Sequence, residues 1–264
     1  MSSPIPVPLQ AFRSGVAIRV VFAAWIAGVV PAAAVSAQET ITSDRPGIGS
    51  GSGVVGPGVV QVETGLALGG GRSYTDLSVG QALVRLGVSA FELEFFGNSY
   101  VIGVQDESGV AERDGLQPPG LGAKVAVVRT PAVSLSLQGL AFLPGGSGAQ
   151  GSEDGAFGLN ALADVPVSDR VAVNGNVGIR AATGGKPAWS ASVTPSYAFG
   201  GGVSGYVGWA GSFTSGSEVN FAEAGLAFLA NPNLQLDVNG GRAVGDGLWF
   251  MGVGAAFRRG AGPG

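Results

Sequence analysis

The feature that most constrains this chain is a period of two in its apolar side chains, clearest in the last two runs. In the first of these runs Leu234, Leu236 and Val238 share one face, opposite Gln235, Asp237 and Asn239. In the second run Trp249, Met251, Val253, Ala255 and Phe257 share a face opposite Phe250, Gly252, Gly254 and Ala256. A period of two is typical of a pleated strand with two unlike faces. With the turn Ala230-Asn231-Pro232-Asn233 nearby, the pattern predicts a β-hairpin.

The same alternation recurs along most of the chain and predicts about twelve strands. Before the final hairpin it is found in the runs 60–68, 82–88, 91–95, 121–127, 133–138, 157–165, 171–180 and 189–199, and less regularly in 203–213 and 218–229. Pro195 interrupts one of these runs and cannot donate a ladder hydrogen bond, so we expect an edge or a bulge there.

A soluble β-sandwich and a membrane barrel both fit alternating strands, and composition decides between them. Only 12% of the residues are charged, and beyond the N-terminus no apolar run approaches a membrane helix of about 20 residues. Strands of about ten residues can cross a bilayer at a tilt, and unpaired edges are not tolerated in hydrocarbon. The sequence therefore predicts an all-β fold, an antiparallel transmembrane up-and-down β-barrel of about 12 strands.

The lengths of the connections between strands predict how the barrel is oriented in the membrane. Alternate connections are tight, for example Ser89-Ala90 and Gly200-Gly201-Gly202, whereas the longest connections are residues 104–119 and 144–154. Short periplasmic turns that alternate with longer outer loops are typical of outer-membrane barrels. Aromatic residues near the strand ends are candidates for two girdles, with Phe221 and Trp249 assigned to the outer one.

The N-terminal region predicts export from the cytoplasm. Arg13 and Arg19 lead into the apolar residues 20–30, and small residues fill 32–37, the pattern of a signal peptide. We therefore expect four segments: a signal peptide at 1–37, a lead-in rich in glycine, serine and proline at 38–57, an outer-membrane β-barrel at 58–258, and a C-terminal tail at 259–264. The lead-in is interpreted as a linker or as a plug-like segment. The expected location is the bacterial outer membrane.

The absence of cysteine and histidine from the sequence excludes several chemistries. Disulfides, thiolate nucleophiles, Ser-His-Asp triads and zinc or haem sites with His or Cys ligands are all excluded. A net charge of −4 without a cluster of basic residues argues against nucleic acid as a partner. The glycines of the lead-in lack the Gly-Lys-Ser/Thr of a phosphate loop. We expect no cofactor and no metal site.

If the polar faces line the lumen, the ionisable side chains there are candidates for the functional residues. These candidates are Glu63, Arg85, Glu92, Glu94, Lys124, Asp164, Arg180, Glu223 and Asp237. One hypothesis is a water-filled path whose acidic excess favours cations. The other is a closed lumen in which Arg85, Lys124 and Arg180 pair with carboxylates on neighbouring strands. Catalysis by Glu92 and Glu94 is a third and weaker hypothesis, since lumen-facing acids at this spacing occur in any barrel.

Three stretches resemble the bacterial outer-membrane transporter family labelled putative meta-pathway of phenol degradation. Ser43-Asp44-Arg45-Pro46-Gly47 followed by residues 56–65 resembles the family's opening Asp-Arg-Pro and first strand. Leu83-Val84-Arg85-Leu86-Gly87 before Phe91-Glu92-Leu93 is similar to its second and third strands, and residues 231–237 and 249–254 are similar to its closing hairpin. The tail after Phe257 and the high glycine and alanine content depart from the family pattern. The resemblance implies a transporter for aromatic or other hydrophobic small molecules, and it gives no catalytic site.

We therefore expect a porin-like transporter that passes small solutes passively, aromatic or hydrophobic ones among them, and that is not an enzyme. The alternative is a closed barrel with a structural or adhesive role through the loop at 104–119. The expected partners are outer-membrane lipid, a small-molecule solute and, during insertion, the barrel-assembly machinery. No single segment indicates a homo-oligomer.

Overall fold

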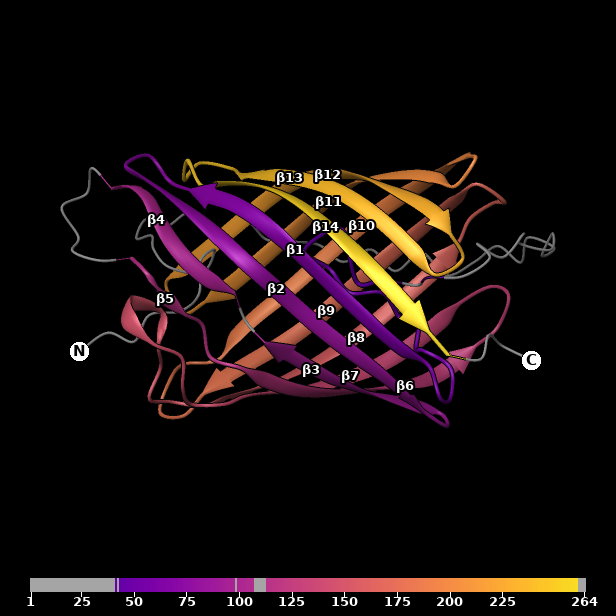
Figure 1. Ribbon diagram of the computed structural model, residues 1–264, viewed down its shortest axis with the longest axis horizontal. Helices are drawn as coiled ribbons and strands as arrows, with labels where there is room; N and C mark the ends of the chain where they lie inside the picture. The colour runs from indigo at the N-terminus through magenta and orange to yellow at the C-terminus, as the bar shows by residue number, and fades with distance from the viewer. Residues whose placement is uncertain (1–40, 42, 98, 107–112, 261–264) are drawn as a thin grey trace.

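The computed structural model describes residues 41, 43–97, 99–106 and 113–260, and it shows an antiparallel β-barrel (Figure 1). The signal peptide predicted for residues 1–37 lies outside the described residues. The strands are tilted relative to the long axis of the barrel, as closure of a sheet requires (Figure 1). No helix among the described residues is long and apolar enough to cross a membrane.

The strands form one antiparallel sheet, in which the first strand also pairs with the last. The strands are β1 (Val60–Gly70), β2 (Tyr74–Val88), β3 (Phe91–Gly97), β4 (Tyr100–Asp106), β5 (Gly115–Leu116), β6 (Gly120–Arg129), β7 (Ser134–Phe142), β8 (Ala156–Pro166), β9 (Val171–Ala182), β10 (Ala188–Gly200), β11 (Val203–Thr214), β12 (Ser217–Asn231), β13 (Leu234–Ala243) and β14 (Trp249–Arg259). The ring closes between β1 and β14, from Val60↔Arg259 to Gly70↔Trp249.

These elements make the 12-strand barrel that the sequence predicted. β3 and β4 both pair with β2, so they are two halves of one barrel strand. β5 pairs with β4 and β6 pairs with β3, so β5 and β6 are likewise halves of one strand. The register of β2 shifts opposite Gly65 and Leu66, next to Gly80, whose φ of +76° favours glycine.

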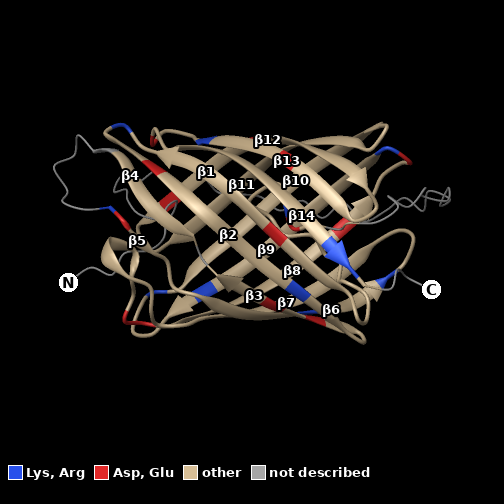
Figure 2. Cartoon of the chain, in the orientation of Figure 1, with Lys and Arg blue, Asp and Glu red and all other residues tan. Residues whose placement is uncertain are grey.

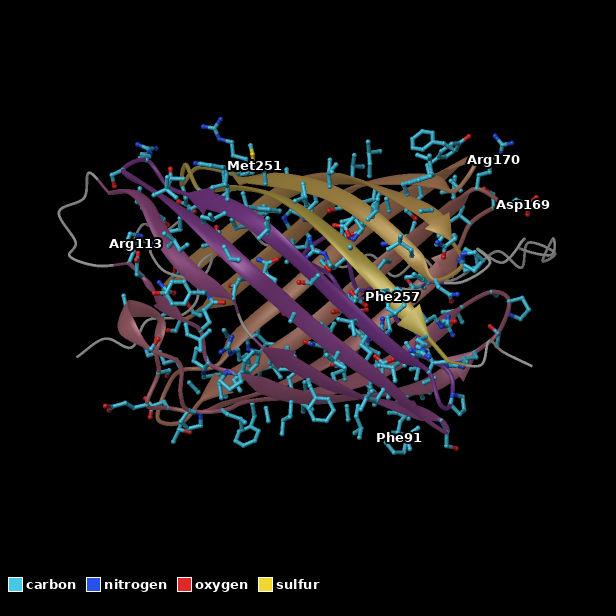
Figure 3. All side chains as sticks on the ribbon, viewed as in Figure 1. Phe91, Arg113, Asp169, Arg170, Met251 and Phe257 are labelled. Carbon is cyan, nitrogen blue, oxygen red and sulfur yellow. The ribbon has the colours of Figure 1, made fainter. Side chains whose placement is uncertain are left out.

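The alternation separates an apolar outer face from a polar inner face. Met251, Val253 and Phe257 are each at least 51% exposed, and Phe91 and Met251 point away from the barrel (Figure 3). The intervening polar side chains are buried inside, as Gln235 and Asp237 show for the final hairpin. An apolar outside and a polar inside are the reverse of a soluble fold and match a barrel surrounded by lipid.

Two details differ from the sequence-based expectations. Phe221 is 5% exposed and packs inside the barrel with Val219, Ala243 and Leu248, rather than in an outer aromatic girdle. It lies on the same face as Glu223, and the period of two places both inside. Residues 104–106 and 115–116 belong to β4 and β5 rather than to a loop. Charged residues lie at both ends of the barrel and at scattered positions along its strands (Figure 2).

Candidate channel lumen

Residues 43–57, here called the lumen segment, run through the interior of the barrel and bind strands on several sides of it. The backbone N–H of Ile48 donates to Glu223, 3.1 Å, and that of Val55 donates to Glu92, 2.7 Å. Ser52 donates from both its backbone N–H and its hydroxyl to Asp164, each at 2.6 Å. Carboxylates of β3, β8 and β12 thus hold one segment, which places it across the bore.

Polar side chains of the barrel also donate to the carbonyl groups of the lumen segment. Asn174 and Asn176 donate to the carbonyl of Ser50, at 3.1 and 2.9 Å. Ser136 donates to the carbonyl of Ser52, 2.6 Å. Backbone outside regular structure must find partners where water is scarce. The asparagines and serines on the inner faces of these strands supply them.

Arg85 lies at the centre of a buried charge cluster between β1, β2 and β3. Its side chain is 0% exposed and makes ion pairs with Glu92, 2.9 Å, and Glu63, 3.2 Å. A longer ion pair of 3.8 Å reaches Asp44 of the lumen segment. The same guanidinium donates to the carbonyl of Gly53, 2.7 Å. One arginine of the wall therefore binds the lumen segment at two places.

Lys124 is the second cation of this cluster and is also 0% exposed. Its ammonium group pairs with Asp44 at 2.9 Å, and with Glu92 and Glu94 at 3.4 Å each. Burial raises the pKa of Asp44, but Arg85 and Lys124 lower it more strongly, so the net pKa lies below the ordinary value. Asp44 is therefore ionised at neutral pH and is held between two buried cations.

Three carboxylates, Asp44, Glu92 and Glu94, lie close enough together to suggest a cation site, within 4.8 Å of one another. The ammonium group of Lys124 is within 3.4 Å of all three, and the guanidinium of Arg85 also pairs with Asp44 and Glu92. Glu94 also accepts two hydrogen bonds from Gln138, at 3.0 and 2.8 Å. The geometry is that of an internal ion-pair network.

Arg45 makes a further charged connection between the lumen segment and the wall. Its guanidinium pairs with Asp237 of β13, 3.2 Å, and donates to Gln81 of β2, 3.2 Å. The backbone carbonyl of Arg45 accepts a hydrogen bond from Gln235, 3.1 Å. An added Cβ at Gly254 would collide with the Arg45 guanidinium, so glycine at this position of β14 leaves room for it.

The sequence-based lumen candidates fall into three groups. The first, Glu63, Arg85, Glu92, Glu94 and Lys124, forms the main charge cluster. The second, Asp164, Glu223 and Asp237, binds the lumen segment directly. The third is Arg180, which lies over the ring of Phe142, 3.7 Å from its centroid, instead of pairing with a carboxylate among the described residues.

Asp44 and Arg45 are the functional candidates that the strand pattern did not supply. They precede the first alternating run, so their side chains could not be assigned to a face of any strand. The one signal for them was the Asp-Arg-Pro sequence that carries the family resemblance.

A cavity of about 220 Å³, here called the outer chamber, lies beside the lumen segment, towards the loops predicted to face outward. Its apolar lining includes Val101, Phe221, Leu248 and Phe250, and the rings of Phe221 and Phe250 meet edge to face at 5.8 Å. Its polar lining is Arg45, Asp76, Ser78, Gln81, Gln117 and Asn239. A second cavity of about 430 Å³ lies on the opposite side of the lumen segment, towards the end predicted to be periplasmic, where Pro166, Ser204 and Ala227 contribute to its lining.

The family model described as "Putative MetA-pathway of phenol degradation" matches residues 43–258. The chain belongs to this family. The match begins within the lumen segment, so in this member of the phenol-degradation family it covers the segment and the barrel together. No curated protein matches the sequence.

Solved structures with the same fold are outer-membrane channels and porins. The chain is similar to the COG4313 outer membrane channel from Pseudomonas putida F1, with a TM-score of 0.68 and 14% identity over 81% of this chain and 99% of that one. It is also similar to the KdgM porin in complex with disordered oligogalacturonate, with a TM-score of 0.55 and 12% identity over 75% of this chain and 98% of that one. The NanC porin gives a TM-score of 0.52 and 7% identity over 75% of this chain and 98% of that one. These structures show that the phenol-degradation family member has the fold of an outer-membrane β-barrel.

Proposed function

We propose that this protein is a passive outer-membrane channel for small solutes, and that the lumen segment narrows its axial path. The observation that carries the proposal is the outer chamber, a cavity of about 220 Å³ that ends on the lumen segment at Arg45, Gly47 and Ile48. A solute that enters from the outside meets this chamber first. Its onward path depends on how firmly Asp44 and Arg45 hold the segment in the bore.

The lining of the outer chamber favours small solutes with an apolar body and few polar groups. Phe221, Leu248 and Phe250 offer a surface on which a ring or a short hydrocarbon packs, and Asn239 and Gln81 offer hydrogen-bonding groups at its edge. Mostly apolar walls with a few convergent polar groups are typical of small-molecule sites. Aromatic solutes with one or two polar substituents fit this chemistry, and the family label points in the same direction.

The ionisable lumen residues have a structural role in this proposal. The carboxylates accept hydrogen bonds from the lumen segment or from buried cations. Without these partners they would give a water-filled bore its preference for cations. We therefore expect a narrow path with weak cation preference rather than a wide porin. Glu92 and Glu94 are held by Arg85, Lys124 and Gln138, which favours a structural role for them over the catalytic hypothesis.

The first experiment is single-channel recording of the refolded mature protein in planar bilayers, with permeation of aromatic and hydrophilic solutes measured in liposomes. We expect small conductance steps and faster entry of the aromatic solutes. Impermeability to ions and to both solute classes, from protein shown to be folded and inserted, would contradict the channel proposal. That result would favour the closed structural or adhesive barrel instead.

A second experiment tests the outer chamber itself. An aromatic solute that occupies the chamber should block the ion current, and Phe250→Ala should weaken this block about tenfold, the effect of losing roughly 1.4 kcal/mol of packing. Phe199→Ala is the matched control, because Phe199 is 58% exposed on the outer face. Equal block in the two variants would refute the chamber as the solute site.

A further inference from the structure

The outer face of the barrel carries an apolar hollow over β10–β13, here called the lipid-side groove, with a volume of about 640 Å³. Tyr197 and Phe199 line one side of it, and their rings meet edge to face at 5.1 Å. Val207, Leu226 and Val238 also line it, and each is at least 50% exposed. The groove therefore opens towards the hydrocarbon of the membrane.

Small or shortened residues create this groove. Pro195, Gly205, Ala224 and Gly240 contribute to its lining where larger residues stand elsewhere on the outer face. An added Cβ at Gly205 would lie 2.9 Å from Leu226 and 3.0 Å from Phe199, so glycine lets these side chains lie where they do. The β10–β11 register passes from Val193↔Trp209 to Ser196↔Tyr206 without pairs in between. Proline in this strand thus coincides with a local interruption of the ladder beneath the groove.

A positive charge stands at the periplasmic end of the groove. Arg170 belongs to the short turn between β8 and β9, and its carbonyl accepts a hydrogen bond from the backbone N–H of Ala198, 2.8 Å. The Arg170 guanidinium lies within electrostatic reach of the Tyr197 hydroxyl, and Tyr197 lines the groove. Arg170 is exposed, and it extends from the turn in a different direction from Asp169 (Figure 3). The Arg170 guanidinium is therefore placed where the lipid-side groove meets the membrane surface.

We propose that the lipid-side groove binds one glycerophospholipid of the periplasmic leaflet, with an acyl chain along Pro195, Gly205 and Ala224 and the phosphate on Arg170. Arginine binds phosphate with charge-assisted hydrogen bonds, and a basic side chain beside an apolar groove matches both parts of a phospholipid. The turn that carries Arg170 is one of the short turns, which assigns this end to the periplasmic leaflet. The site lies outside the lumen and does not depend on the proposed channel function.

Native mass spectrometry tests this proposal on the full barrel transferred from mixed phosphatidylethanolamine and phosphatidylglycerol vesicles into a mild detergent. We expect one retained phospholipid per wild-type barrel. Ala224→Phe fills the groove and should abolish retention, whereas Ala222→Phe, on the same face of β12 but outside the groove, should not. Heat-modifiable migration in gels confirms that each variant is folded.

The charged end is tested separately. Arg170→Gln should lower phospholipid occupancy about tenfold, as expected for the loss of one charge-assisted hydrogen bond. Arg129→Gln, an exposed arginine at the end of β6, is the matched control and should have no effect. Three outcomes would each overturn the proposal. The first is phospholipid retention that survives Ala224→Phe, and the second is an equal effect of Arg170→Gln and Arg129→Gln. The third is a dimer of the barrel that only Ala224→Phe dissociates.

Discussion

Removal of one charge from the lumen segment should release it from the bore. Asp44→Asn keeps the size of the side chain but removes its ion pairs with Lys124, 2.9 Å, and Arg85, 3.8 Å. Loss of a buried ion-pair partner costs about 3–5 kcal/mol when the other charge is left alone. Here both cations keep Glu92, and asparagine still accepts a hydrogen bond, so we expect about 2 kcal/mol, near the value for one charged hydrogen bond.

The assay is the fraction of time that a single channel spends in a higher-conductance state. A loss of about 2 kcal/mol should raise the ratio of released to bound segment about 30-fold. Asp169→Asn is the matched control, because Asp169 is exposed in a turn. A double-mutant cycle with Lys124→Met should give a coupling energy above about 0.5 kcal/mol. Additive effects, or an unchanged high-conductance fraction in Asp44→Asn, would show that this ion pair does not hold the segment.

Three further predictions concern single residues. Gly87→Ala should displace the lumen segment, because a Cβ there collides with the backbone carbonyl of Gly56. The displaced segment should then be cut by added protease. Gly97→Ala is the control and should leave cleavage unchanged, because there is open space around Gly97. Val193→Arg on the lipid face should lower the free energy of unfolding in lipid by about 2–4 kcal/mol. Val244→Arg, in an outer loop, is the control. An equally small loss in both variants would contradict the assignment of Val193 to the lipid-facing side. Arg113→Gln should speed backbone hydrogen exchange around β5. The reason is that Arg113 donates two hydrogen bonds to Asp76, each at 2.6 Å, and lies over the ring of Tyr74. Unchanged exchange would show that these contacts do not order the outer loops.

The sequence alone determined the barrel, because the period of two is a property of the pleated strand itself. Leu236 and Asp237 had to point to opposite faces whatever surrounded them, and the low charge content decided which face met lipid. The same reasoning placed Glu63, Arg85 and Glu92 inside. The assignment of an aromatic girdle misplaced Phe221, because aromatic type suggested a rim position while alternation puts its side chain on the inner face with Glu223.

Only the tertiary structure decided what occupies the bore. The lumen segment has no periodicity, so nothing local indicates that Ile48 binds Glu223 or that Ser52 binds Asp164, which are 175 and 112 residues away. The partners of Arg85 and Lys124 were likewise open, because several carboxylates face the same lumen and the register fixes which ones come within reach. The lipid-side groove also required the fold, since Pro195, Gly205 and Ala224 become neighbours only when β10, β11 and β12 pair. Contacts between distant residues depend on strand register and closure, which alternation along a single strand does not encode.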